Sequence, residues 1–211
     1  YTIGSYADIR LTAPPVTLND PIMDCNWMLT NTTFQNALTG SGNYVFTQTE
    51  LVLEGDMIVD GCNIELKGSE LIFRQDPVNN PSLTISNGGS VTMTVDTLTG
   101  DTPKIYGEGN REAVDISIVA GGTLDMQGGS MKNFLLGGKT GQLVVGSGGL
   151  FSMSDAAYLT SSDLATAGLS DLPLIHADGG LVTTTGSVTL AGSSNLGIGV
   201  KLTDGGDLSG D

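Results

Sequence analysis

The C-terminal two-thirds of the chain repeats one short template five times. Each copy has an alternating apolar segment, a Gly-Gly pair and a second alternating segment, and the pairs begin at Gly88, Gly121, Gly148, Gly179 and Gly205. Successive pairs are 33, 27, 31 and 26 residues apart, a period typical of stacked structural units. Alternation with a period of two is the pattern of β-strands, and glycine allows the backbone to turn between them. The pattern therefore predicts an all-β fold, a right-handed parallel β-helix (β-solenoid) of about six or seven coils.

Apolar residues recur at fixed positions around the glycine pairs. Five residues before the first glycine stand Leu83, Ile116, Leu143, Leu174 and Val200, three before it Ile85, Ile118, Val145, His176 and Leu202, and three after it Val91, Leu124, Phe151, Val182 and Leu208. We expect these columns to face inward, which makes His176, the single histidine, a core residue. An arched, amyloid-like β layer would show the same alternation and remains the alternative fold.

The two parts of the chain differ in regularity. Residues 49–211 follow the template or a close variant of it, whereas residues 1–48 contain Pro14-Pro15 and Asn19-Asp20-Pro21. Because proline cannot donate to a strand ladder, we predict an irregular N-terminal arm or cap with the first coil over residues 1–48. The repetitive solenoid then occupies residues 49–211.

Charge and composition exclude several classes of protein. The chain has 8 basic and 23 acidic residues, a net charge of −15, and such a surface repels nucleic acid. It has no apolar run of 18 residues, so no membrane insertion is expected. Low lysine content with abundant Gly, Ser, Thr and Asp is typical of secreted surface proteins, which predicts an extracellular, cell-surface location. Tyr1 is not methionine, which is expected of a processed or trimmed chain.

Two cysteines occur in similar local sequences, Cys25-Asn26-Trp27-Met28-Leu29 and Cys62-Asn63-Ile64-Glu65-Leu66. If both occupy the same turn on adjacent coils, their Cα atoms lie about 5 Å apart, within the range of a disulfide. An intrachain Cys25–Cys62 disulfide is the favoured interpretation, and an intermolecular bridge or two thiols are the alternatives. Asn31 begins the one usable glycosylation sequon, Asn31-Thr32-Thr33.

Catalytic patterns are weak in this sequence. Polysaccharide hydrolases need converging carboxylates, but Asp125, Asp155, Asp178 and Asp204 fall near turns of separate coils. A lone histidine with no partner at a readable spacing makes no nucleophilic triad. We therefore predict no enzyme activity, no catalytic residue, no cofactor and no specific metal site. Calcium at the acidic turns stays open, because Asp204-Gly205-Gly206-Asp207 is a fragment of a calcium-binding repeat.

The segments Leu-Thr-Ile-Ser-Asn-Gly-Gly-Ser-Val-Thr-Met (83–93) and Ile-Ser-Ile-Val-Ala-Gly-Gly-Thr-Leu-Asp-Met (116–126) resemble repetitive extracellular β-helix proteins of bacterial and archaeal surfaces. These include adhesin regions, S-layer-like proteins and the sheath proteins of methanogens, and the likeness covers residues 49–211. The resemblance implies a structural or adhesive role with no catalytic residues. An adhesin or carbohydrate-binding module is the alternative function, with surface polysaccharide as its partner, and a polysaccharide lyase or hydrolase is the second alternative.

The last coil leads to a prediction about assembly. Val200, Leu202 and Leu208 keep the template register, and the sequence then reaches Asp211 without a polar cap. An uncovered strand edge is a template for pairing with another chain, and solenoid ends need capping. We expect this edge to be covered by another subunit or by a continuation of the chain. The favoured function is a structural protein that assembles with copies of itself into a surface layer, sheath or filament.

Overall fold

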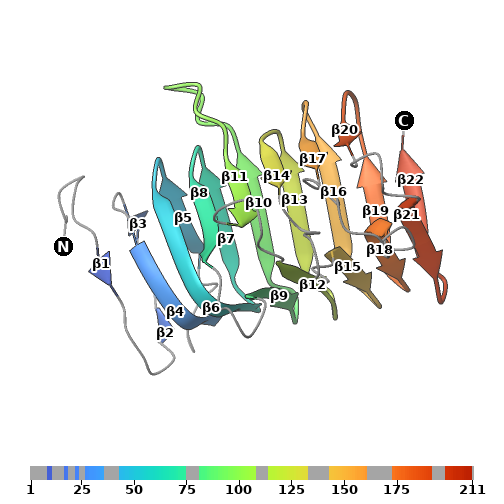
Figure 1. The fold of residues 1–211 in the computed structure, drawn as a ribbon, viewed down its shortest axis with the longest axis horizontal. Helices are drawn as coiled ribbons and strands as arrows, with labels where there is room; N and C mark the ends of the chain where they lie inside the picture. Colours follow the sequence, from blue (N-terminus) through green and yellow to red (C-terminus); the bar gives the residue numbers. More distant parts are fainter. Residues whose placement is uncertain are drawn as a thin grey trace, which may run out of the picture.

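The computed structural model is all-β and elongated (Figure 1). It describes residues 9–10, 17–18, 22–23, 27–35, 43–74, 81–107, 114–132, 143–160, 173–191 and 198–210. These ranges contain 22 strands and no helix, and so no helix able to cross a membrane. The strands stand side by side in a row that runs from the N-terminal to the C-terminal end of the chain (Figure 1).

The strands form two hydrogen-bonded sheets with parallel ladders. The 14-stranded sheet contains β1 (Ile9–Arg10), β2 (Thr17–Leu18), β4 (Trp27–Gln35), β6 (Glu50–Asp60), β8 (Glu70–Arg74), β9 (Ser82–Ser86), β11 (Lys104–Gly107), β12 (Asp115–Ile118), β14 (Ser130–Lys132), β15 (Leu143–Gly146), β17 (Tyr158–Thr160), β18 (Pro173–Asp178), β20 (Thr189–Ala191) and β21 (Ile198–Thr203). The 8-stranded sheet contains β3 (Ile22–Met23), β5 (Asn43–Thr47), β7 (Asn63–Lys67), β10 (Ser90–Thr94), β13 (Thr123–Gln127), β16 (Leu150–Ser154), β19 (Leu181–Thr184) and β22 (Asp207–Gly210).

The larger sheet divides at β6, so each coil has three faces. The first half of β6 pairs with β8, and its second half pairs with β9. We call β8, β11, β14, β17 and β20 with the first half of β6 the first face, and β9, β12, β15, β18 and β21 with its second half the second face. The 8-stranded sheet is the third face. Three faces per coil identify the predicted parallel β-helix and not an arched layer.

Glycine pairs make the turns from the second face to the third. Gly88, Gly121, Gly148, Gly179 and Gly205 all have positive φ, a conformation that glycine adopts without steric cost. The second glycine of a pair meets a different constraint, because a Cβ atom on Gly122 would lie 2.2 Å from the carbonyl oxygen of Ile85 in the preceding coil. One glycine therefore sets the direction of the chain, and the other allows the coils to stack closely.

The core is built from the alternating columns that the sequence predicts. Leu83, Ile116 and Leu143 are in register on adjacent strands, as are Val91, Leu124, Phe151 and Val182 on the third face. All of these side chains are at most 1% exposed. Burying one apolar side chain of this size stabilises the fold by about 2 kcal/mol. The parallel stack includes β4 and β5, which precede residue 49.

One column prediction is wrong, at strand β18. The register pairs Val145 with Ala177 and Val144 with His176, so Ala177 takes the inward position and His176 points outward. The connection from the inward Ala177 to the inward Val182 is one residue shorter than the one from Val145 to Phe151. Counting back from Gly179 therefore misplaces β18 by one residue, and such a shift moves every side chain to the other side of a strand. Leu174 is buried, but Ile175 takes the column position opposite Val200.

The last described coil leaves its apolar residues partly open. Leu190, Leu202 and Leu208 are 39%, 48% and 43% exposed, although Leu202 and Leu208 pair in register with the buried Ala177 and Val182. Val200 is partly buried against the core. Their position in the columns is the predicted one, and their exposure arises because no described coil lies beyond β20, β21 and β22.

Candidate functional site

The predicted disulfide stays a prediction, because Cys25 lies outside the described residues. The strands that follow the two cysteines belong to different faces: Trp27 pairs with Leu51 in the larger sheet, and Ile64 pairs with Tyr44 on the third face. The similar sequences are therefore not equivalent positions in the stack. Cys62 is 1% exposed, and burial raises the pKa of its thiol to about 11.

The predicted glycosylation site, Asn31, lies within β4, where the register against β6 shifts between Thr30 and Thr32. The structure does not test whether it is modified. Of the acidic residues near turns, Asp125 is on the third face, Asp178 is on the second face, and Asp155 and Asp204 are in turns. Asp178 pairs in register with Thr203, which directly precedes Asp204, so these two acids are on adjacent coils. Among the described residues no group of three His, Cys, Asp or Glu side chains is arranged to hold a metal ion.

A polar cluster on the outer side of the second face was missed by the sequence analysis. The Thr203 hydroxyl donates to Asp178 Oδ1 at 2.5 Å, and His176 Nε2 lies 2.8 Å from Thr203 Oγ1. Because the single hydroxyl proton is given to Asp178, Nε2 must be the donor in the second bond. A histidine that donates to a hydroxyl cannot deprotonate it, so this geometry is not that of an activated nucleophile. The sequence signal for this cluster was the spacing His176-x-Asp178, because residues two apart on a strand lie on the same side of the sheet.

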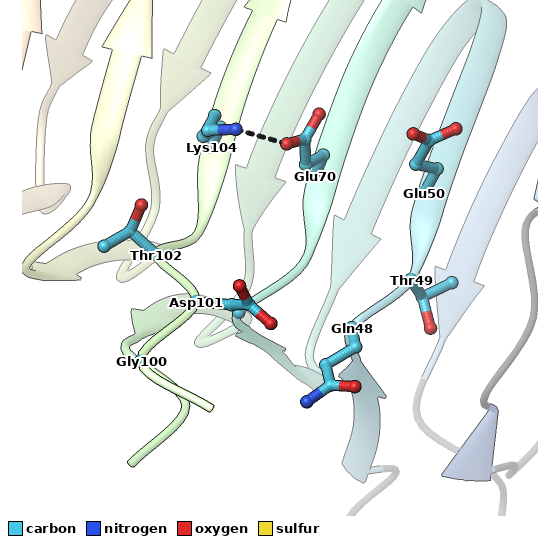
Figure 2. Close-up of a pocket in the computed structure, with 9 residues that line it drawn as sticks. Gln48, Thr49, Glu50, Glu70, Gly100, Asp101, Thr102 and Lys104 are labelled. Atoms are coloured by element: carbon cyan, nitrogen blue, oxygen red, sulfur yellow. Dashed lines mark hydrogen bonds and ion pairs between the residues drawn. The ribbon is translucent and has the colours of Figure 1, made fainter. Parts of the chain in front are cut away.

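The described residues also form a polar hollow of about 320 Å³ at the corner between the third and first faces (Figure 2). Its lining residues are Gln48, Thr49, Glu50, Gly68, Glu70, Gly100, Asp101, Thr102 and Lys104. Glu50, Glu70 and Lys104 come from the consecutive strands β6, β8 and β11, where they pair in register. The turns that precede these strands supply the remaining residues, so the corner of the coil builds the hollow.

Asp96 organises the longest described turn beside this hollow. Asp96 is 1% exposed, and its carboxylate accepts hydrogen bonds from the Leu98 amide at 3.0 Å and from Gln48 Nε2 at 2.8 Å. These bonds, with the Lys67 ammonium 4.0 Å away, hold the pKa of Asp96 below its usual range. The Gly100 amide donates to the Asp96 carbonyl at 2.7 Å and closes the turn. Hydrogen bonds to a charged acceptor thus help to hold this turn in place.

Glu70 is the centre of the hollow's charged wall. One of its oxygens forms an ion pair with Lys104 (Figure 2), and the other accepts a hydrogen bond of 2.7 Å from the Tyr106 hydroxyl. Partial burial alone would raise the pKa of Glu70, but the bonds from Lys104 and Tyr106 and the charge of Lys132 outweigh it and lower the pKa. A general acid at neutral pH needs a raised pKa. Glu70 is therefore suited to hold Lys104 and Tyr106 in place and not to donate a proton.

The described coils define a parallel β-helix whose outer sides carry polar ladders and which has a polar hollow at the corner between the third and first faces. No known protein family, curated protein or solved structure matches this chain. The polar lining of the hollow fits a hydroxyl-rich or charged ligand better than an apolar one.

Proposed function

We propose that the protein is a non-catalytic structural protein of the cell surface that assembles end to end with copies of itself into a layer, sheath or filament. The observation that carries this proposal is the C-terminal coil, where column residues Leu202 and Leu208 are 48% and 43% exposed. In the coils before it, the same columns are covered by the next strand.

The backbone of this coil supports the same proposal. Strands β20, β21 and β22 each pair on one side only within the described residues. Exposed strand edges recruit further strands, and a head-to-tail contact of this kind continues into a filament or closes into a ring. A second copy offers the matching geometry, because the coils from β6 to β22 present parallel strands with the same three-faced outline.

Charge sets the conditions for assembly. Copies that each carry a net charge of −15 repel one another, and salt screens this repulsion over a Debye length of about 8 Å at 0.15 M. We therefore expect association to be weak at low ionic strength and to strengthen as salt is added. An interface held together by ion pairs would instead weaken as salt is added.

The test is sedimentation velocity and negative-stain microscopy of the full chain at several protein and salt concentrations. The wild-type protein should form larger species as its concentration rises. Leu202→Thr combined with Leu208→Thr should leave it monomeric, because the end then loses apolar surface but keeps β-compatible residues. Leu98→Thr is the control, since Leu98 is 89% exposed in a turn away from this end.

Two results would contradict the proposal. One is a wild-type protein that stays monomeric at every concentration, as expected if a further part of the same chain covers the edge. The other is a double variant that assembles as well as the Leu98→Thr control.

A further inference from the structure

The outer side of the first face carries an unusual set of residues, which we call the first-face patch: Lys104, Tyr106, Ser130, Lys132 and Tyr158. Lys104 pairs with Ser130 and Tyr106 with Lys132 on adjacent strands, and Ser130 pairs with Tyr158 on the next. Their neighbours Ile105, Met131 and Leu159 are buried, so alternation places the patch residues on the outer side of the sheet.

The charge of the patch is positive, opposite in sign to the net charge of the protein. From β8 to β20 the outer side of this face carries the cations Arg74, Lys104 and Lys132 and one carboxylate, Glu70. On the adjoining half of β6, a second carboxylate, Glu50, pairs in register with Glu70. All other described side chains, Glu50 included, together carry two cations, Lys67 and Lys201, and twelve carboxylates. Three of the five cations among the side chains with described burial are therefore on this one face.

The patch also contains the two accessible aromatic residues among the side chains whose burial is described. Tyr106 and Tyr158 are partly exposed, whereas the other aromatic side chains with described burial, Tyr44, Phe46, Phe73 and Phe151, are buried in the core. The two tyrosines lie two strands apart and two positions apart along the strand direction. This offset corresponds to about 12 Å between their Cα atoms, so one sugar ring cannot contact both, but an oligosaccharide can.

Two members of the patch are held in place and two are available. Glu70 accepts from Tyr106 at 2.7 Å and pairs with Lys104, which fixes both side chains against the sheet. Lys132 is exposed and has no ion pair or hydrogen bond to a described residue, and the Tyr158 hydroxyl has no hydrogen bond to one. Because Lys104 and Tyr106 are already ordered, less conformational entropy is lost when a ligand binds to them and to the neighbouring Lys132 and Tyr158.

From these observations we infer that the first-face patch binds an anionic polysaccharide, a sugar chain with carboxylate or sulfate groups. Lys104 and Lys132 would contact the anionic groups. The rings of Tyr106 and Tyr158 would pack against the apolar C–H faces of the sugars, because tyrosine combines an apolar ring with a polar hydroxyl. This inference concerns a different surface from the C-terminal coil and does not depend on self-assembly.

The net charge of the protein gives polyanion binding a distinctive dependence on salt concentration. At very low ionic strength the net charge of −15 repels a polyanion as a whole. At about 0.15 M salt the Debye length is about 8 Å, which screens distant carboxylates but leaves contacts within the patch. Near 1 M it falls to about 3 Å and weakens those contacts too. Binding should therefore be strongest at intermediate salt, whereas binding through a uniformly basic surface only weakens as salt is added.

The experiment is affinity electrophoresis of the full protein in gels that contain polygalacturonate, heparin or neutral dextran. The protein should be retarded by polygalacturonate or heparin but not by dextran, and the two polyanions distinguish carboxylate from sulfate recognition. Lys132→Gln should weaken retardation about threefold to fivefold, as for the loss of one exposed charge contact. Tyr158→Thr should also weaken it, and this variant suits the fold because Thr189 is the register partner of Tyr158.

The matched control is Lys201→Gln, which changes the same charge at an exposed residue on the second face. Its binding should equal that of the wild type. The inference is overturned if neither polyanion binds, if dextran binds equally well, or if Lys201→Gln weakens binding as much as Lys132→Gln. A loss of self-association in Lys132→Gln without any polysaccharide effect would instead show that the patch contacts another copy.

Discussion

The two glycines of one turn should respond very differently to the same substitution. A Cβ atom at Gly122 would lie 2.2 Å from the carbonyl oxygen of Ile85 and 2.6 Å from its carbonyl carbon. Relief of this overlap requires the coils to move apart by about 1 Å. The same oxygen accepts a hydrogen bond of 3.0 Å from the Val119 amide, and that movement would break it.

The magnitude follows from these two effects. The lost hydrogen bond costs about 1 kcal/mol, and the overpacking adds about 2 kcal/mol. Gly122→Ala should therefore lower the free energy of unfolding by about 3 kcal/mol. Gly121→Ala should cost only about 1 to 2 kcal/mol, the price of placing alanine in a left-handed conformation, because φ is +80° there and the nearest atom to a Cβ is 3.6 Å away.

The assay is thermal and denaturant unfolding followed by circular dichroism, with Gly121→Ala as the matched control. In a chain of this size Gly122→Ala should lower Tm by about 10 °C and Gly121→Ala by about 4 °C. The order of the two midpoints is informative even if the solenoid unfolds in stages. Equal midpoints, or a less stable Gly121→Ala, would refute the reasoning that close stacking of the coils requires the second glycine.

Three further predictions concern single side chains. The pKa of Asp96 is lowered by bonds from Leu98 and Gln48, so its stabilisation of the turn should be present at neutral pH and lost as pH falls below about 4. The protection factor of the Gly100 amide, which corrects for the intrinsic pH dependence of exchange, should fall in acid, and it should fall at neutral pH in Asp96→Ala. Reduced Cys62, with its pKa near 11, should react with iodoacetamide at pH 8 about a hundredfold more slowly in the folded protein than in denaturant. If the predicted disulfide is present, the denatured, non-reduced protein should not be labelled at Cys25 or Cys62. Phe151→Ala should destabilise the fold by about 3 to 5 kcal/mol, because Phe151 is 0% exposed; a smaller loss in denaturant unfolding would mean that the core collapses around the cavity.

The coil architecture could be predicted from local sequence because its causes are local. Alternation shows which side of a strand is apolar, and a glycine pair shows where the chain turns, so Leu83, Val91 and their equivalents before the last coil were correctly assigned to the core. The prediction failed at His176 because it counted back from a glycine through a connection whose length varies. What sets the register there is burial of Ala177 beside Val145, a contact between residues 32 positions apart in the sequence.

The candidate sites lay beyond the reach of sequence patterns for a related reason. Glu70, Lys104 and Tyr158 are on neighbouring or nearby strands of the first face, yet Lys104 follows Glu70 by 34 residues and Ser130 follows Lys104 by 26. No fixed period connects them, mainly because the turns from the third face to the first differ in length: nine residues separate β10 from β11, but only two separate β13 from β14. The cluster of His176, Asp178 and Thr203 depends likewise on a strand pairing that a one-residue change in a turn would alter.

The sequence by itself determined the repeating unit, its parallel strands and the composition of its core, because alternation and turn chemistry act between residues that are close along the chain. Only the tertiary structure decided which outward side chains meet, both in the hollow around Glu70 and in the first-face patch with its tyrosines and lysines. Stacking brings residues from successive coils to within about 5 Å. Which residues become neighbours is set by the lengths of the connections and by burial of the columns, and neither is visible in any short stretch of sequence.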